Sequence, residues 1–119
     1  MGDDQIAAIR PAIAQALEAS TADDVRCASF EVSGDTARWV QVLPDAINMA
    51  YPAVEPPEIL PAHVHVLSLR EWKADEYATF DVAEGVTAMD LARIVDALFQ
   101  GVLGCGSDYR LDVRVEKLG

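Results

Sequence analysis

Positive charge is scarce in this sequence. Its 119 residues include nine lysines and arginines against twenty aspartates and glutamates, which gives a net charge of −11. Nucleic acids and anionic membrane surfaces bind basic protein faces, so we expect neither as a partner. The same excess of acid attracts basic proteins or peptides, although acidity also serves simply to keep a protein in solution.

Cysteines and long apolar runs are scarce as well. The only two cysteines, Cys27 and Cys105, form no Cys-x-x-Cys motif. We expect both to be reduced, in the core or half-buried. No apolar run approaches the roughly 20 residues that span a bilayer. The acidic start at Asp3 and Asp4 lacks the features of a secretory signal, so we expect a cytoplasmic protein.

Motifs for catalysis or cofactor binding are missing. Gly101, Gly104 and Gly106 follow an expected helix instead of opening one, and no Gly-Lys-Ser or Gly-Lys-Thr is present, which excludes a phosphate loop. The alternating acids of a calcium loop are also absent. We therefore expect no catalytic residue, no cofactor and no enzymatic activity.

What the sequence does contain is enough apolar material for a core. Hydrophobic residues make up 51% of the chain, and its length suits one domain over residues 1–119. Apolar residues spaced by three and four predict a first helix over residues 4–19. Pro11 lies inside it and predicts either a kink or a main helix that begins near Pro11.

A second helix is predicted between Thr87 and Gly104. Thr87 and Asp90 form a pair of the capping-box type at its start, and Gly104 ends it. Its expected apolar face contains Leu91, Ile94, Val95, Leu98, Phe99 and Val102. Arg93, Asp96 and Gln100 are expected on the solvent side.

Six segments have the composition or alternation of strands: Val25–Val32, Thr36–Leu43, Ala46–Tyr51, Val64–Trp72, Tyr77–Val82 and Tyr109–Glu116. Short connections make neighbouring strands antiparallel, and each helix has one apolar stripe. Four prolines between residues 52 and 61 exclude a strand interior there. We predict an α+β fold in the order α-β-β-β-β-β-α-β, with two helices on one face of an antiparallel five- to six-stranded sheet.

Aromatic and apolar strand residues are the candidate partner-binding surface. The segments Trp39–Leu43 and Ile47–Tyr51 carry apolar groups on both sides, and a sheet that is apolar on both faces needs a second cover. A partner subunit or a bound segment would supply that cover. The candidate residues are Trp39, Met49, Tyr51, Trp72 and Tyr77. The alternative is that these side chains belong to the core.

His63 and His65 are the only two histidines and stand two residues apart. Residues at this spacing on a strand share a face, so both rings could reach one metal ion. A third ligand from Cys27, Cys105, Asp81 or Glu71 would be needed. The alternative is a pair of surface histidines after the proline-rich segment, and we assign no metal site.

The element order resembles the YbjN-like, type III secretion chaperone-like family of small bacterial domains. The resemblance is carried by Trp39-Val40-Gln41-Val42, by Trp72 before a polar turn, and by the helix from Asp90-Leu91-Ala92 to Leu103. It covers residues 4–104 and implies a homodimer that binds a partner segment without catalysis. The strand Tyr109–Glu116 departs from the family, whose members usually stop after the long helix.

Three functions follow as hypotheses. The first is a non-enzymatic protein-binding or chaperone-like module that forms a homodimer and binds an unidentified protein or peptide segment. The second is a small metal-binding protein or enzyme that uses His63 and His65. The third is an acidic accessory subunit that docks a basic partner within a larger complex.

Overall fold

The structure is a computed structural model that describes residues 3–20, 25–51, 66–106 and 109–118. Two helices and six strands follow one another in the predicted order, which confirms the α+β fold. The strands form one antiparallel sheet. The elements are α1 (Asp3–Ala19), β1 (Val25–Val32), β2 (Asp35–Val42), β3 (Ala46–Ala50), β4 (Leu67–Lys73), β5 (Tyr77–Val82), α2 (Ala88–Gly101) and β6 (Leu111–Leu118).

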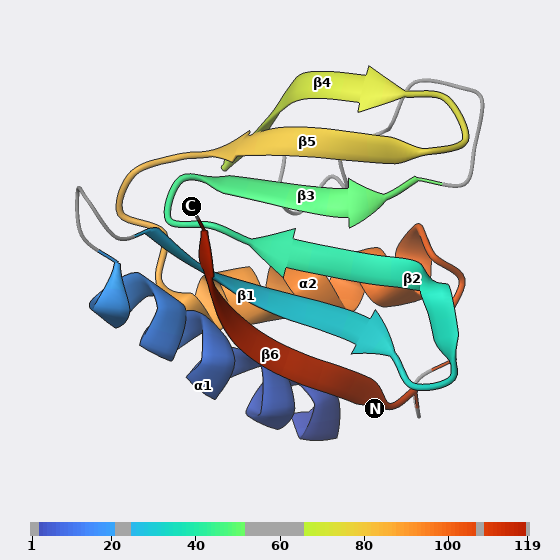
Figure 1. Ribbon diagram of the computed structural model, residues 1–119, viewed down its shortest axis with the longest axis horizontal. Coiled ribbons are helices and arrows are strands. Elements are labelled where there is room, and N and C mark those ends of the chain that lie inside the picture. Colours follow the sequence, from blue (N-terminus) through green and yellow to red (C-terminus); the bar gives the residue numbers. More distant parts are fainter. Residues whose placement is uncertain (1–2, 21–24, 52–65, 107–108, 119) are drawn as a thin grey trace.

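The strands lie side by side in the order β4-β5-β3-β2-β1-β6 (Figure 1). Tight turns connect the strands within each of two hairpins, β1–β2 and β4–β5. Gly34 has a φ of 81° between β1 and β2, a backbone conformation that glycine adopts without strain. Asp75 has a φ of 61° between β4 and β5, where aspartate is one of the better tolerated residues. Strand β6 returns from the far end of the chain and pairs with β1 at the edge of the sheet.

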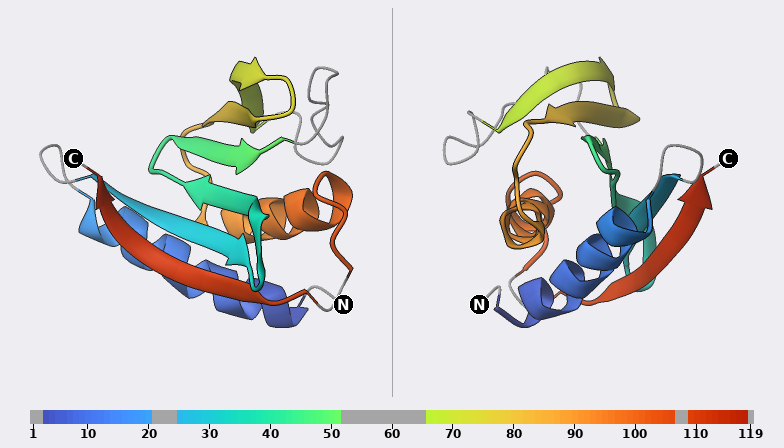
Figure 2. Two further views of the ribbon diagram at one scale, coloured as in Figure 1. Left: turned by 45° about the vertical axis from the view of Figure 1, so that its right-hand side comes forward. Right: turned by 90° about the vertical axis from the view of Figure 1, so that its left-hand side faces the viewer.

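Both helices cover the same face of the sheet, as the side view in Figure 2 shows. Alternation along the strands turns Phe30, Val40, Ile47 and Phe80 toward them, and all four side chains are buried. From the helices, Ile9, Ile13, Ile94, Val95 and Phe99 complete the core. The predicted arrangement of two helices on one sheet face therefore holds.

Helix α1 runs without interruption through Pro11. A proline in a helix interior removes the hydrogen bond to the carbonyl four residues earlier, here that of Ala7. Ala7 and Pro11 are both exposed, so water can satisfy that carbonyl. Of the two predicted alternatives, the late start near Pro11 is therefore wrong: the helix continues through Pro11, because the lost hydrogen bond falls on the solvent side.

Helix α2 begins with the capping box predicted from the sequence. The Thr87 hydroxyl accepts a hydrogen bond from the Asp90 amide at 3.1 Å, and the Asp90 carboxylate accepts one from the Thr87 amide at 3.4 Å. At the other end, Gly104 has a φ of 70°. The Cys105 amide donates to the Phe99 carbonyl at 2.9 Å, which satisfies a carbonyl that the helix leaves free.

Replacing Thr87 by alanine should lower the free energy of unfolding by about 1 kcal/mol. The Asp90 amide would lose its acceptor while the rest of α2 stays unchanged. Urea denaturation followed by circular dichroism measures the loss. A Thr87→Ser variant keeps the hydroxyl and should remain close to the wild type, so equal losses in both variants would contradict the capping role.

Candidate functional site

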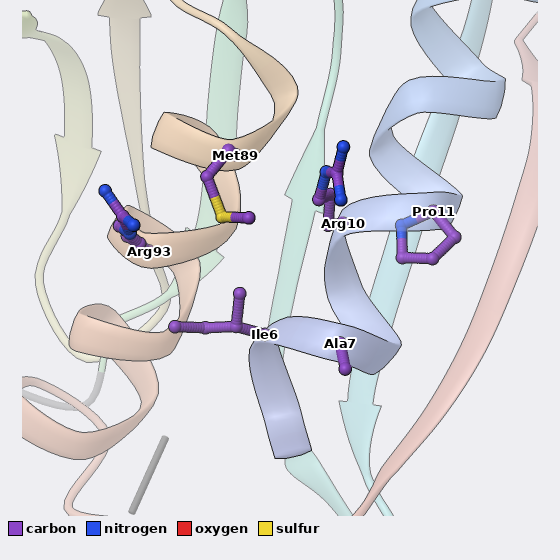
Figure 3. Close-up of a pocket in the computed structure, with 6 residues that line it drawn as sticks. All are labelled: Ile6, Ala7, Arg10, Pro11, Met89 and Arg93. Atoms are coloured by element: carbon purple, nitrogen blue, oxygen red, sulfur yellow. The ribbon is translucent and has the colours of Figure 1, made fainter. Parts of the chain in front are cut away.

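A groove between α1 and α2 is the candidate site (Figure 3). The two helices pack against each other, and their first halves leave a space of about 370 Å³. Helix α1 contributes Ile6, Ala7, Arg10 and Pro11, and helix α2 contributes Met89 and Arg93. The volume lies near the lower end of the range for ligand pockets, which runs from about 300 to 1,000 Å³.

Helical spacing explains how both walls of the groove arise. Residues four apart lie on the same side of a helix. Ile6 precedes Arg10 by four residues in α1, and Met89 precedes Arg93 by four residues in α2. Ile6 and Met89 point across the space between the helices, while the two arginines stand at its rims (Figure 3). The groove therefore combines an apolar centre with two cationic rims.

The arginines of the groove differ from most other cations of the described residues. Arg10 and Arg93 are exposed, and the ion pairs found among the described residues include neither of them. Four other cations are paired with carboxylates of the chain itself: Arg38 with Asp35 at 3.3 Å, Lys73 with Glu76 at 2.8 Å, Arg114 with Glu31 at 3.8 Å and Glu116 at 3.6 Å, and Arg70 with Asp81. The rims of the groove thus offer two positive charges to an external anion.

The five predicted partner-binding residues do not share one surface. Met49 and Tyr51 are buried in the core on the helix side of the sheet. Trp72 is half-buried against it, with its ring edge-on to that of Tyr51 at 6.1 Å between ring centres. Trp39 and Tyr77 lie on the opposite face, because each alternates with buried neighbours on its strand. Core packing accounts for the first three positions.

The face of the sheet away from the helices is more polar than expected. Trp39 lines a shallow hollow of about 100 Å³ there. The other side chains that share this face at the hollow are polar: Ser29, Glu31, Gln41, Arg114 and Glu116. Farther along, Thr79 donates a hydrogen bond to Asn48 at 2.6 Å. The apolar run Trp39–Leu43 was expected to give a second apolar face. Its Val40 and Val42 are instead both buried on the helix side of the sheet.

Tyr77 is engaged by its own chain. Its hydroxyl donates a short hydrogen bond to the Glu71 carboxylate on the neighbouring strand β4. That hydrogen bond is the main reason that the pKa of Tyr77 is raised, and the negative charge of Glu71 adds to it. A partner that uses the Tyr77 hydroxyl would first have to displace Glu71.

A buried polar cluster lies beneath the end of α2. Asp96, which was expected on the solvent side, is 9% exposed. Its carboxylate accepts a hydrogen bond from the Tyr109 hydroxyl at 2.6 Å and two from the Gln100 amide at 2.9 and 3.0 Å. Burial and the hydrogen bond to Asp96 raise the pKa of Tyr109. These hydrogen bonds all lie within the chain, so the cluster ties α2 to Tyr109, which lies just before β6. We therefore interpret it as a contribution to stability.

Both cysteines are free and buried, as expected. Cys105 lies near this cluster, with the Arg38 guanidinium 3.8 Å from its sulfur. Cys27 lies on β1, 3.8 Å from the Ser29 hydroxyl.

The predicted histidine pair, His63 and His65, lies outside the described residues. Within the described ranges, no three histidine, cysteine, aspartate or glutamate side chains are grouped so that they could hold a metal ion. None of the helices in the described part of the chain is long and apolar enough to cross a membrane.

Sequence reasoning missed the groove as a site. It placed Arg93 on the solvent side of its helix and did not single out Arg10. The available signal was the repeat of an apolar residue followed four positions later by arginine, once in each helix. What could not be read from the sequence is that α1 and α2 lie beside each other.

No protein-family model matches this chain, and neither a curated protein nor a solved structure matches it. The resemblance to YbjN-like chaperones therefore stays a prediction.

Proposed function

We propose that this protein is a non-enzymatic protein-binding module whose α1–α2 groove receives a partner segment that carries both carboxylate and apolar side chains. The supporting observation is the pair of exposed arginines, Arg10 and Arg93, on the two rims of an apolar groove. Guanidinium groups bind carboxylates through paired hydrogen bonds. Ile6 and Met89 between them supply apolar contact, and methionine adapts its shape to varied side chains.

The net charge of −11 opposes an acidic partner at long range. At physiological ionic strength, however, exposed charges are screened over about 8 Å. A carboxylate seated in the groove lies closer to the two rim arginines than to most of the acids of the protein. We therefore expect slow association and an affinity set by contacts within the groove.

The proposal includes self-association and a cytoplasmic location. Two free, buried cysteines suit a reducing compartment. The polar side chains around Trp39 weaken the argument that a second copy covers this face of the sheet, and we propose that a dimer uses another surface.

Binding of two labelled octapeptides tests the groove: one alternates glutamate and leucine, and the other has glutamine in place of glutamate. We expect the acidic peptide to bind about tenfold more tightly, since about 1.4 kcal/mol from two guanidinium contacts suffices for that factor. Fluorescence anisotropy measures both affinities. The double variant Arg10→Gln, Arg93→Gln should bind the two peptides equally.

The matched control is Lys73→Gln, which removes a positive charge from the β4–β5 hairpin. It should keep the preference for the acidic peptide. Absence of peptide binding, or a preference that survives loss of both arginines, would contradict the proposal. Binding of octanoate without binding of either peptide would assign the groove to a small amphiphile and would contradict a protein-binding role.

A further inference from the structure

The two edges of the sheet differ in regularity. Strand β4 forms one edge, and its pairing with β5 is interrupted by a register shift between Leu69 and Glu71. Such irregularities discourage the addition of a further strand. Strand β6 forms the other edge and pairs with β1 without interruption over eight residue pairs. A regular edge strand is a template on which another strand can pair.

The backbone groups of β6 that face outward can be identified. The Ser33 amide donates to the Arg110 carbonyl at 2.9 Å, so the backbone of Arg110 faces β1. In an antiparallel pair, successive residues alternate between facing the partner strand and facing away. Leu111, Val113 and Val115 therefore direct their amide and carbonyl groups toward the free edge. An incoming strand can form hydrogen bonds with these three residues.

Charges alternate along β6 in a self-complementary way. Arg110, Asp112, Arg114 and Glu116 occupy successive positions on the face away from the helices. If two copies of β6 pair antiparallel about Val113, Arg110 lies opposite Glu116 of the second copy, and Asp112 lies opposite Arg114 of the second copy. All four charged pairs are then of opposite sign, an arrangement that stabilises cross-strand pairing.

Neighbouring registers lack this property. With the axis at Arg114, Arg114 lies opposite Arg114 of the second copy, and Asp112 lies opposite Glu116. With the axis at Asp112, Asp112 lies opposite Asp112 of the second copy, and Arg110 lies opposite Arg114. Like charges directly opposite each other destabilise a sheet. Charges on an edge strand ordinarily discourage pairing. Here they disfavour the two adjacent registers, and the register about Val113 is the one that places all four charged residues opposite a charge of the other sign.

The centre of this register is apolar and exposed. Val113 is 37% exposed and lies opposite Phe30 on the helix side of the sheet. Val113 and Leu69 are the two exposed large hydrophobic residues of the described chain, and each lies on an edge strand. Pairing about Val113 brings the valines of two copies together and removes both from water. Of the two edges, only that of Val113 has uninterrupted pairing beside it.

We propose that the protein forms a symmetric dimer in which β6 of two copies pair antiparallel about Val113, so that two six-stranded sheets become one. Both copies of α1 then lie on the same face of the joined sheet, where α1 already packs against β6. Ala8 is exposed on α1, does not line the groove and has a small side chain, which leaves room for a close approach of the two helices. This dimer names the surface for the self-association included in the proposed function, and it does not depend on the groove.

Charge reversal tests the register. Asp112→Arg and Arg114→Glu each place like charges opposite each other twice per dimer. Each variant should raise the dimer dissociation constant by about tenfold, as expected for the loss of two favourable cross-strand pairs. The double variant Asp112→Arg, Arg114→Glu restores opposite signs and should return to within about threefold of the wild type. Sedimentation equilibrium measures the constants, and circular dichroism verifies that each variant is folded.

Val113→Pro is the second test. The Val113 amide faces away from β1, so proline there removes no hydrogen bond of the sheet but blocks the centre of the interface. A folded monomer is the expected result. A monomeric wild type, or a dimer unchanged by all these variants, would overturn the proposal. The octapeptides should bind the β6 variants as they bind the wild type, so failure of the dimer and failure of the groove are distinguishable.

Discussion

Replacing Phe99 by alanine is expected to lower the free energy of unfolding by about 3–5 kcal/mol. The ring is fully buried on the sheet side of α2, and its centre lies 5.2 Å from that of Tyr109. Removing it leaves a cavity among residues of α1, α2 and the sheet that cannot all move to fill it. Because a domain of this size has a total stability of about 5–15 kcal/mol, the variant would be close to unfolding.

Guanidinium denaturation monitored by circular dichroism measures this change. The control is Phe99→Leu, which keeps most of the apolar volume and should lose less than about 1.5 kcal/mol. A loss below about 1 kcal/mol in the alanine variant would contradict the buried position of the ring, since removal of a buried aromatic ring costs several times more. Failure of the alanine variant to fold would agree with the expected size of the effect, provided that the leucine variant folds.

Tyr109→Phe should be the second costly substitution, with a loss of about 1–3 kcal/mol at neutral pH. The phenol is the closest donor to the buried Asp96 carboxylate, at 2.6 Å, and phenylalanine fills the same space without donating. Gln100 alone would then satisfy Asp96. In an Asp96→Asn background the same substitution should cost less, because a neutral acceptor loses less than a carboxylate when its donor is removed. Urea denaturation of the four proteins gives the coupling free energy.

The cost of Tyr109→Phe should also depend on pH. Burial and the hydrogen bond to Asp96 raise the pKa of Tyr109 above that of the unfolded chain, which is about 10. The stabilising contribution of the protonated phenol is fully present below that pH. Above it, the unfolded chain gains by losing the proton, so the contribution declines as pH rises. The stability difference between wild type and Tyr109→Phe should therefore stay constant up to about pH 10 and narrow as the pH rises above it.

Tyr77 also has a raised pKa, but it is present in both proteins and its effect cancels from the difference. A difference that stays constant as the pH rises above about 10 would contradict a phenol held protonated by the fold. Chemical denaturation at each pH is the measurement.

The fold was largely predictable because local patterns determine most of its elements. Alternation identified β1 and β5 with their observed bounds, and the Thr87–Asp90 pair marked the start of α2. Strand β6 begins at Leu111 and not at the predicted Tyr109. The reason is tertiary, since the Tyr109 side chain is buried against Asp96 and Phe99 before the strand begins.

The site was less predictable, because it depends on contacts between distant segments. Helical period alone places Asp96 toward solvent, and only the arrival of Tyr109 thirteen residues later buries it. Arg10 and Arg93 are ordinary exposed arginines in their own helices. They become the rims of one groove only where α1 and α2 pack together. The five candidate partner-binding residues do not share a surface, because strand alternation turns three of them toward the helices and two toward the opposite face.

The pairing of β1 with β6 has a consequence for how the chain folds. The paired residues are between 111 − 32 = 79 and 118 − 25 = 93 positions apart, whereas β1 and β2 join across a two-residue turn. Contacts this distant must pay the entropy of closing a long loop before they stabilise anything, which slows folding. During synthesis, one edge of β1 therefore stays unpaired until nearly all of the described chain has left the ribosome. In that interval its edge is open to pairing with other nascent chains, and β6 closes it last.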